Sequence, residues 1–295
     1  MTILPFDDRD GFIWFNGKMV AWRDAKVHVL THGLHYGSCV FEGVRVYNSK
    51  IFKLREHTER LINSAKLLGF DLPYTLNELE TATKETVLKQ NVVNGYIRPV
   101  AWRGSEMMAI SAQKNKIHVA IASWEWPSYF SKEAKERGLR LQISKWARPA
   151  PNTIPTASKA AGLYMICTLS KHAAENDGFD DSLMLDYRGL LAEATGANLF
   201  LVMDGKIHTP TPDCFLDGIT RRTVIDLARA RGIEVIERHI YPDELQNVQE
   251  VFLTGTAAEV TPVGQINSEA WGEQKFSVGN ITKQLMEDYS AKVLE

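Results

Sequence analysis

The sequence predicts an α+β fold in two domains. Its 295 residues are enough for two domains of about 100–200 residues each. Strand pairs joined by tight turns dominate the first part, whereas helices and strands alternate in the second. The strand pattern breaks in "WEWPSYFSK", residues 124–132, where aromatic residues surround a proline. We therefore expect a smaller N-terminal α/β domain over 1–124, an interdomain loop over 125–135 and a larger C-terminal β/α domain over 136–295.

The first elements are predicted to be strands. "FIWFNGKMVAW" reads as a hairpin that turns at Asn16-Gly17, because this pair readily adopts the positive φ angles of a two-residue turn. "VFEGVRVYNSKIFKL" reads as a second strand pair that turns near Asn48-Ser49. Further along, "GYIRPVAWRG" and "KIHVAIASW" have the composition of strands, and Pro99 indicates an irregularity in the first of them.

Two helices are expected between these strands. In "EHTERLINSAKLLGF", residues 56–70, apolar residues recur at helical spacing, and Gly69 is suited to a left-handed end. Asn77 and Glu80 have the spacing of a capping box for a second helix that runs to about Gln90.

The second part mixes helices with strands. We expect a helix over 162–177, a hairpin around Asp204-Gly205, a helix over 220–231 and a closing helix from about Ile281. Strands are predicted at "DSLMLDYRGLLAEAT", "IEVIERHI" and "EVFLTG".

Composition excludes several classes of function. The 34 basic and 36 acidic residues leave a net charge of −2, and the basic residues are spread along the chain, so neither nucleic acid nor a membrane surface is an expected partner. Cys39, Cys167 and Cys214 are far apart and form no C-x-x-C, which argues against disulfides and a metal site and fits a cytoplasmic location. The acidic start "MTILPFDDRD" does not resemble a signal peptide, and no stretch has the roughly 18 apolar residues of a membrane helix.

Lys159 stands alone in "TIPTASKAAGLYMI". No acidic or basic residue accompanies it from Thr153 to Ser170. Such a lysine can simply lay its stem on apolar surface. Alternatively, burial can lower a lysine pKa by up to about 3–5 units and leave a neutral amine that forms a Schiff base with a carbonyl cofactor.

Other segments offer what a pyridoxal phosphate site would need. Glu193, between two alanines, is either a hairpin carboxylate or the group that keeps a pyridine nitrogen protonated. The helix start at Thr220, which follows Gly218, and the turn "GTAAEV" provide backbone N–H groups for a phosphate. Arg55 could add a bidentate charge, although it could also be an ordinary surface arginine.

Taken together, the motifs resemble those of one family. "HGLHYGSCVFEG", "REH", "YIRP", "APNTIPTASKA", "EATGANLF", "LDGITR" and "GTAAEVTPV" occur in the order found in branched-chain amino acid aminotransferases, which belong to fold-type IV of the pyridoxal phosphate enzymes. The resemblance runs essentially end to end. It implies the two-domain fold of the D-amino acid aminotransferase-like enzymes and pyridoxal 5'-phosphate as cofactor.

The resemblance also implies residue roles. Lys159 and Glu193 are the catalytic pair that it implies. The residues implied for the cofactor are Arg55, Lys159, Tyr164, Glu193, Gly196, Leu216, Ile219, Thr220 and Thr256. Those implied for the substrate are Tyr36, Phe41, Tyr96, Arg98, Tyr129, Thr256 and Ala257. Trp126 and Met108 are further candidates for the apolar pocket.

The function implied is the reversible transfer of the amino group of L-leucine, L-isoleucine and L-valine to 2-oxoglutarate. The substrates are therefore small amino acids and 2-oxo acids, and the family's sites imply at least a homodimer, with Tyr36 reaching into the neighbouring subunit. Alternatives on the same fold are a D-amino acid transaminase, an aminodeoxychorismate lyase and an (R)-amine transaminase. A non-enzymatic binding protein is disfavoured because Lys159 and Glu193 are both present.

Two departures from the family pattern bear on the site. Asp217 replaces a common proline, so we expect a looser turn before the phosphate-binding helix. "RGSEMMAI", residues 103–110, replaces a more glycine-rich loop and leaves one wall of the side-chain pocket undefined.

Overall fold

The chain divides into two units, and the short segment that carries Lys159 belongs to the first of them. The structure is a computed structural model that describes residues 4–126 and 130–295. The first unit comprises Met1–Pro127 and Ser158–Leu163, and the second comprises Ser128–Ala157 and Tyr164–Glu295. The expected division at 125–135 did not include this return of the chain to the first unit.

An antiparallel sheet forms the centre of the first unit. Its strands are β1 (Phe12–Phe15), β2 (Lys18–Ala21), β3 (Cys39–Phe41), β4 (Val44–Tyr47), β5 (Lys50–Ile51), β6 (Gly95–Arg103) and β7 (Ile117–Glu125). They lie in the order β2-β1-β7-β6-β4-β5, and β3 pairs with β6. The predicted turns are present, since Asn16 and Gly17 have φ of 50° and 88°, and Asn48 and Ser49 have φ of 46° and 65°.

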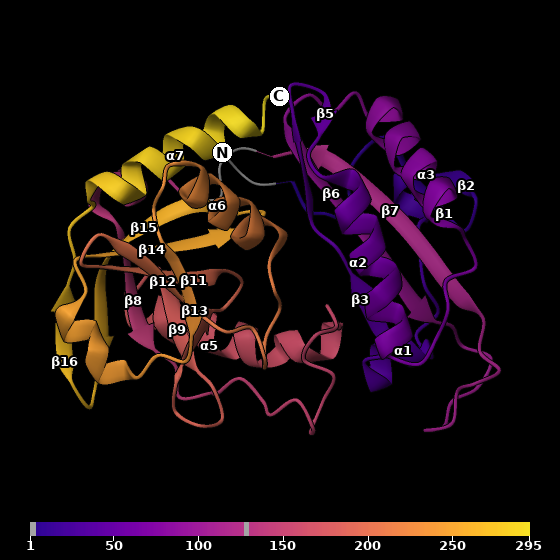
Figure 1. The fold of residues 1–295 in the computed structure, drawn as a ribbon. Helices are drawn as coiled ribbons and strands as arrows, with labels where there is room; N and C mark the ends of the chain where they lie inside the picture. Colours follow the sequence, from indigo (N-terminus) through magenta and orange to yellow (C-terminus); the bar gives the residue numbers. More distant parts are fainter. Residues whose placement is uncertain (1–3, 127–129) are drawn as a thin grey trace. The chain divides into compact units, whose positions relative to one another are not determined.

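Helices α2 and α3 pack on one face of this sheet (Figure 1). The helical elements of the first unit are η1 (Trp22–Asp24), α1 (His32–Tyr36), α2 (Leu54–Leu67), α3 (Leu76–Lys89) and η2 (Ala161–Leu163). Leu61 and Ala65 of α2 are buried in the same core as Leu79 of α3. As expected, Gly69 follows α2 with a φ of 73°.

The start of α3 differs from the expectation. Its N-cap is Thr75, whose Oγ1 accepts a hydrogen bond from the Glu78 N–H, while the Glu78 carboxylate accepts one from the Thr75 N–H. This capping box lies two residues before the predicted pair of Asn77 and Glu80. Both pairs have the spacing of a capping box. The side chains of Asn77 and Glu80 do not form one, because both contact Arg55.

The second unit contains a sheet that closes on itself. Its strands are β8 (Leu139–Ile143), β9 (Asp181–Leu185), β10 (Leu191–Ala194), β11 (Asn198–Met203), β12 (Lys206–Pro210), β13 (Val235–Arg238), β14 (Glu250–Gly255), β15 (Glu259–Ser268) and β16 (Gly272–Lys275). The order β10-β9-β8-β15-β14-β11 becomes a ring because β10 also pairs with β11. Leucines of the ring, such as Leu141, Leu199 and Leu253, are fully buried in its core.

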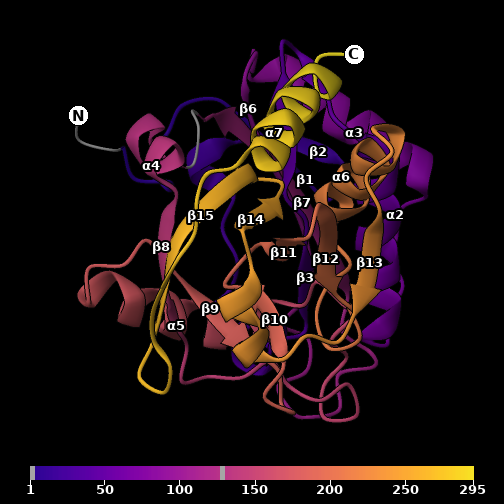
Figure 2. The same cartoon turned by 60° about the vertical axis from the view of Figure 1, so that its left-hand side comes forward.

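Helices cover this ring. They are α4 (Lys132–Arg137), α5 (Tyr164–Asn176), α6 (Ile219–Ala230), η3 (Pro242–Asn247) and α7 (Asn280–Lys292). Helices α6 and α7 pack against each other and against β14, as Figure 2 shows, and α5 packs against β9. The ring brings the end of β10, the start of β11 and the end of β14 to one edge, because Glu193 is opposite Asn198 and Asn198 is opposite Thr254.

Within residues 4–126 and 130–295, the helices are too short or too polar to span a bilayer.

Candidate active site

Backbone hydrogen bonds fasten Lys159 to the first unit. The Phe41 N–H donates to the Lys159 carbonyl at 3.1 Å, and the Lys159 N–H donates to Ser64 Oγ at 3.0 Å. Next to it, Val40 and Ala160 form an isolated antiparallel bridge. The lysine therefore enters from a distant part of the chain and is held by β3 and α2.

The amine of Lys159 lies among aromatic rings and charges. Its Nζ is 5.1 Å from the centroid of the Phe41 ring. Burial is the main cause that lowers the pKa of Lys159 to about 8, and Arg60 lowers it further while Glu42 opposes this. At pH 7 about one tenth of the amine is therefore neutral, and the neutral amine is the form that attacks a carbonyl.

Tyr96 and Arg98 form the second part of this cluster. Arg98 Nη2 donates to Tyr96 Oη at 3.3 Å, and the guanidinium lies 4.7 Å from the centroid of the Phe41 ring. Arg98 Nε is buried and has no hydrogen-bond partner among the described residues. A Cβ on Gly43 would lie 1.7 Å from Tyr96 Oη, so only glycine leaves room for this tyrosine. The cluster can thus receive an anionic group at Arg98.

Of the two candidate arginines on α2, Arg60 and not Arg55 belongs to this cluster. Arg55 is more than half exposed and pairs with Glu80, with Nε and Oε1 2.6 Å apart. Arg60 is largely buried and is the charged group with the largest effect on Lys159. The two arginines differ because α2 turns them to different faces. The sequence carried no signal for this, because the burial of His57, three residues before Arg60, is known only from the structure.

The other predicted substrate residues differ in how close they lie to this cluster. Tyr36 is half exposed on α1 and stacks on His32 with ring centroids 4.5 Å apart. Trp126 meets the Tyr96 ring edge-on at 4.6 Å, which brings it to the cluster. Met108 is 40% exposed, in the 103–110 loop. Tyr129 lies outside the described residues.

In the second unit, Asn198 connects Glu193 with the start of α6. Asn198 Nδ2 donates to Glu193 Oε2 at 3.2 Å and to the Leu216 carbonyl at 2.9 Å. A Cβ on Gly218 would lie 2.2 Å from Asn198 Oδ1. The glycine in the "LDGITR" motif therefore leaves room for the asparagine that orients the carboxylate.

Arg148 is a residue of this site that the sequence did not reveal. Its Nε lies 3.4 Å from Glu193 Oε1, and its Nη1 donates to Cys167 Sγ at 3.4 Å. Burial opposes the charge of Arg148, but Glu193, Cys167 and Tyr164 outweigh burial and raise its pKa. The charged guanidinium in turn favours the ionised form of Glu193. The only sequence signal was a lone arginine between alanine and proline.

The remaining cofactor candidates lie at the same edge of the ring. Helix α6 begins at Ile219, and its N-cap residue is Gly218. Glycine has no side chain that could accept a hydrogen bond from the first N–H groups of the helix, those of Ile219 and Thr220. Thr256 and Ala257 form the turn after β14, and a Cβ on Gly255 would lie 3.1 Å from the Gly196 carbonyl. Two sets of backbone N–H groups thus suit a phosphate or carboxylate.

The turn before α6 is held by ion pairs. We expected Asp217 to loosen it, but its carboxylate accepts a hydrogen bond from Arg221 Nη1 at 2.9 Å. Arg221 is fully buried and also binds Glu237 at 2.8 Å. The buried Arg221 therefore connects the turn at Asp217 with Glu237.

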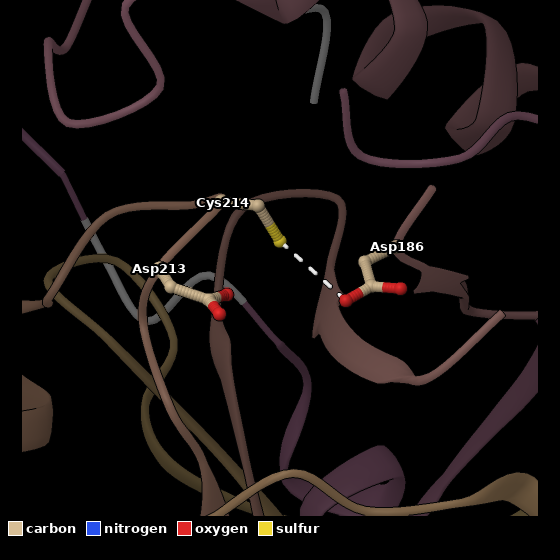
Figure 3. A group of neighbouring side chains, drawn as sticks. All are labelled: Asp186, Asp213 and Cys214. Atoms are coloured by element: carbon tan, nitrogen blue, oxygen red, sulfur yellow. Dashed lines mark hydrogen bonds between the residues drawn. The ribbon is translucent and has the colours of Figure 1, made fainter. Parts of the chain in front are cut away.

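A separate acidic group in the second unit has its charge compensated. Asp186, Asp213 and Cys214 place possible metal-ligand atoms within 4.8 Å of one another (Figure 3). However, Arg188 binds both carboxylates, at 2.6 Å and 2.9 Å. Burial raises the pKa of Cys214 to about 12, so its sulfur stays protonated. Arg188 therefore supplies a positive charge to both carboxylates.

Comparison with known proteins indicates the family to which the chain belongs. Residues 39–266 match the family Amino-transferase class IV. The chain is 41% identical over 286 residues to the branched-chain-amino-acid aminotransferase of Pseudomonas aeruginosa, covering 96% of this chain and 92% of that protein. The crystal structure of the Escherichia coli branched-chain amino acid aminotransferase superposes with a TM-score of 0.90 at 40% identity, covering 96% of this chain and 94% of that one. The PLP form of the Thermobaculum terrenum branched-chain amino acid aminotransferase gives 0.86 at 32% identity, covering 96% and 94%.

These matches confirm both the resemblance seen in the sequence and the two-domain α+β fold expected with it. The chain is a member of the class IV aminotransferase family.

Proposed function

We propose that this enzyme transfers the amino group of L-leucine, L-isoleucine and L-valine to 2-oxoglutarate with the help of pyridoxal 5'-phosphate. The observation that carries the proposal is the amine of Lys159, whose pKa is lowered to about 8 by burial and by Arg60. Relatives about 40% identical over nearly the whole chain are named branched-chain-amino-acid aminotransferases, which supports the substrate class.

The donor set fits the cofactor. The second unit offers a carboxylate oriented by Asn198 and Arg148 and the backbone N–H groups at the start of α6. When bound, pyridoxal phosphate supplies a carbonyl that receives the amino group and a ring that accepts electrons from the substrate. Lys159 would bind the carbonyl carbon and, once displaced, carry a proton as a base.

Each remaining residue has a part that its surroundings support. Glu193 would hold a proton at the ring nitrogen by a charge-assisted hydrogen bond. Thr220, Ile219 and Thr256 would bind the phosphate. We propose Arg60, in place of Arg55, as the arginine near the phosphate, because Arg60 is the one that lowers the pKa of Lys159. Gly196, Leu216 and Tyr164 would line the cofactor.

Substrate selection follows from the cluster in the first unit. Arg98, with its buried Nε, would bind the substrate carboxylate together with Tyr96. Aliphatic side chains have no polar group, so they would be recognised by the rings of Phe41 and Trp126, and each buried CH₂ contributes about 0.8 kcal/mol. One methylene changes binding by only about 1–3 kcal/mol, so all three branched amino acids should react.

A product assay tests the proposal. The purified chain, supplied with pyridoxal phosphate, is given 2-oxoglutarate and one amino donor, and L-glutamate is measured. L-leucine, L-isoleucine and L-valine should each produce L-glutamate, whereas D-leucine and an amine without a carboxylate should not. D-glutamate formed from D-leucine alone, measured in the same samples, would instead support a D-amino acid transaminase. Glutamate of either configuration formed from the simple amine would support an amine transaminase.

Assembly and location are part of the proposal. Val29, Leu34 and Tyr36 are 67%, 67% and 48% exposed near α1, an apolar surface that a second subunit would cover. We therefore propose a homodimer in which Tyr36 contributes to the neighbour's site, and we expect Leu34→Lys to shift the chain toward monomer in analytical ultracentrifugation. The cytoplasmic location remains a prediction.

A further inference from the structure

Arg60 of the Lys159 cluster belongs to a buried group of charges, in which Glu42 and His57 have no role yet in the proposed reaction. Glu42 lies in the two-residue link between β3 and β4, with none of its surface exposed. Its Oε1 accepts a hydrogen bond from Arg60 Nε at 2.6 Å, and its Oε2 accepts one from Arg60 Nη2 at 2.9 Å. His57 Nδ1 donates to Oε2 at 2.7 Å.

The charge state of this group is well defined. Burial opposes the ionisation of Glu42, but Arg60 and His57 outweigh it and hold the Glu42 pKa well below its usual range. Burial also lowers the pKa of His57, although Glu42 acts in the opposite direction. At neutral pH the group therefore consists of a carboxylate, a guanidinium and a neutral imidazole that donates from Nδ1.

The contacts with Glu42 fix the orientation of the Arg60 guanidinium. His57 and Arg60 are three residues apart on α2, so both reach Glu42 from one helix face. The two hydrogen bonds from Nε and Nη2 fix the plane of the guanidinium, which a single bond or a lysine could not do. The charged and titratable groups that interact with the Lys159 amine include Arg60, Glu42 and His57, with Tyr96 and Arg98 of β6.

We propose that Glu42 is a positioning residue of the active site, which fixes the Arg60 guanidinium beside the amine of Lys159. The inference rests on the proposed function only in taking Lys159 as the reacting amine. Glu42 acts through Arg60 and not as a mere counter-charge. The two accounts predict opposite shifts of the Lys159 pKa when the charge of Glu42 is removed, because Arg60 lowers this pKa by more than Glu42 raises it.

Two substitutions separate these accounts. In Glu42→Gln, either orientation of the amide places its NH₂ against an N–H of Arg60, so the arginine is displaced. Glu42→Asp keeps the charge but is shorter by one C–C bond of about 1.5 Å, so it cannot hold Arg60 from the same backbone position. If Glu42 positions Arg60, both variants raise the pKa of Lys159. If Glu42 acts only as a charge, Gln lowers it and Asp leaves it unchanged.

The experiment measures that pKa directly. The cofactor-free full-length chain is labelled with a trace of an acylating reagent between about pH 6 and 10, and modification of Lys159 is quantified by peptide mass spectrometry. Arg60→Met calibrates the result and should raise the Lys159 pKa by about one unit, as expected for loss of a neighbouring charge. Glu80→Gln is the matched control. Glu80, on α3, forms an ion pair with Arg55, which lies on the same helix as Arg60.

The proposal predicts that Glu42→Gln and Glu42→Asp raise the Lys159 pKa toward the value in Arg60→Met and that Glu80→Gln leaves it unchanged. It also predicts that adding Arg60→Met to either variant has little further effect. A lowered or unchanged pKa in the Glu42 variants would overturn it. Glu42→Asp decides the matter if Glu42→Gln does not fold, because it leaves no buried cation without an anion. Since no turnover is measured, a wrong substrate assignment would not affect the result.

Discussion

In the cluster around Lys159 of the first unit, a buried carboxylate accepts two hydrogen bonds from an arginine. In the cluster around Glu193 of the second unit, the carboxylate accepts a hydrogen bond from an asparagine, and the Arg148 guanidinium lies 3.4 Å away. Glu42 and Arg60 contact each other in the first. In the second, Asn198 lies opposite Glu193 on the neighbouring strand, and Gly218 leaves room for it. The comparison indicates that substitutions in the first cluster should act on the Lys159 amine and the substrate carboxylate, whereas substitutions in the second should act on the cofactor.

The largest effect is expected from Lys159→Ala. Without the amine, both the covalent attachment and the proton carrier are lost, so kcat should fall by at least about 10²–10⁴-fold, the usual share of a positioned general base. Steady-state turnover and the mass of the chain after borohydride reduction with cofactor measure the two losses. Retention of turnover would exclude Lys159 as the reacting amine.

Glu193→Gln is the corresponding change in the second unit. The amide keeps the hydrogen bond with Asn198 but not the charge, so the cofactor should remain bound while kcat falls by about 10²-fold or more. Rapid kinetics of the half-reaction measure the step. Glu250→Gln is a suitable control, because this buried carboxylate caps α7 and should affect stability and not the rate. Equal rates in Glu193→Gln and the native chain would contradict the assignment.

Two glycine substitutions sharpen the comparison. In Gly43→Ala the new Cβ would displace Tyr96 and thereby weaken the hold on the substrate carboxylate. KM should rise by about tenfold or more, the effect of losing a charge-assisted hydrogen bond of about 1.5–3 kcal/mol. In Gly218→Ala the cofactor affinity should fall instead, because Asn198 must move.

Gly162→Ala provides the control for both. Its added Cβ would meet its nearest atom only at 4.0 Å, and its φ is not positive. KM and cofactor affinity should both stay near the native values. If Gly43→Ala altered only cofactor affinity, the division of labour between the clusters would be wrong.

The smallest expected effect is on stability. The pKa of Lys159 falls from 10.5 to about 8 on folding, mainly because of burial. At low pH the folded chain therefore holds a buried ammonium, which lowers the free energy of unfolding. This cost is fully present below pH 8 and disappears as the pH rises toward 10.5. Lys159→Met should therefore raise the free energy of unfolding of the cofactor-free chain below pH 8, and the gain should shrink above pH 10.5. Urea unfolding at both pH values tests this, and an equal gain at both would contradict the lowered pKa.

Local patterns in the sequence predicted most of the elements, whereas the catalytic roles of Lys159 and Glu193 stay predictions. The turns at Asn16-Gly17 and Asp204-Gly205 are confirmed, because this turn type depends on the two residues themselves. The choice between Arg55 and Arg60 required knowing which face of α2 is buried. It was wrong to expect a helix start at Asn77, because Thr75 two residues earlier has an equally good pattern.

Long-range contacts could not be predicted from local patterns. The pairing of β8 with β15 in the ring, and the return of Ser158–Leu163 to the first unit, both depend on segments far apart in the sequence. Arg148 was missed for the same reason, since its partner Glu193 is 45 positions away (193 minus 148). The charge of Glu42 was likewise visible in the sequence, but its contact with Arg60 was not.

The absorption spectrum of the purified chain with pyridoxal phosphate, recorded before and after adding L-leucine or D-leucine, tests the central claim most directly. A yellow absorption band should form, L-leucine should bleach it and D-leucine should leave it unchanged. This result would establish the bound cofactor, the first half of the transfer and the handedness of the substrate together. A band bleached only by D-leucine would contradict the substrate, and a chain that never becomes yellow would contradict the role of Lys159.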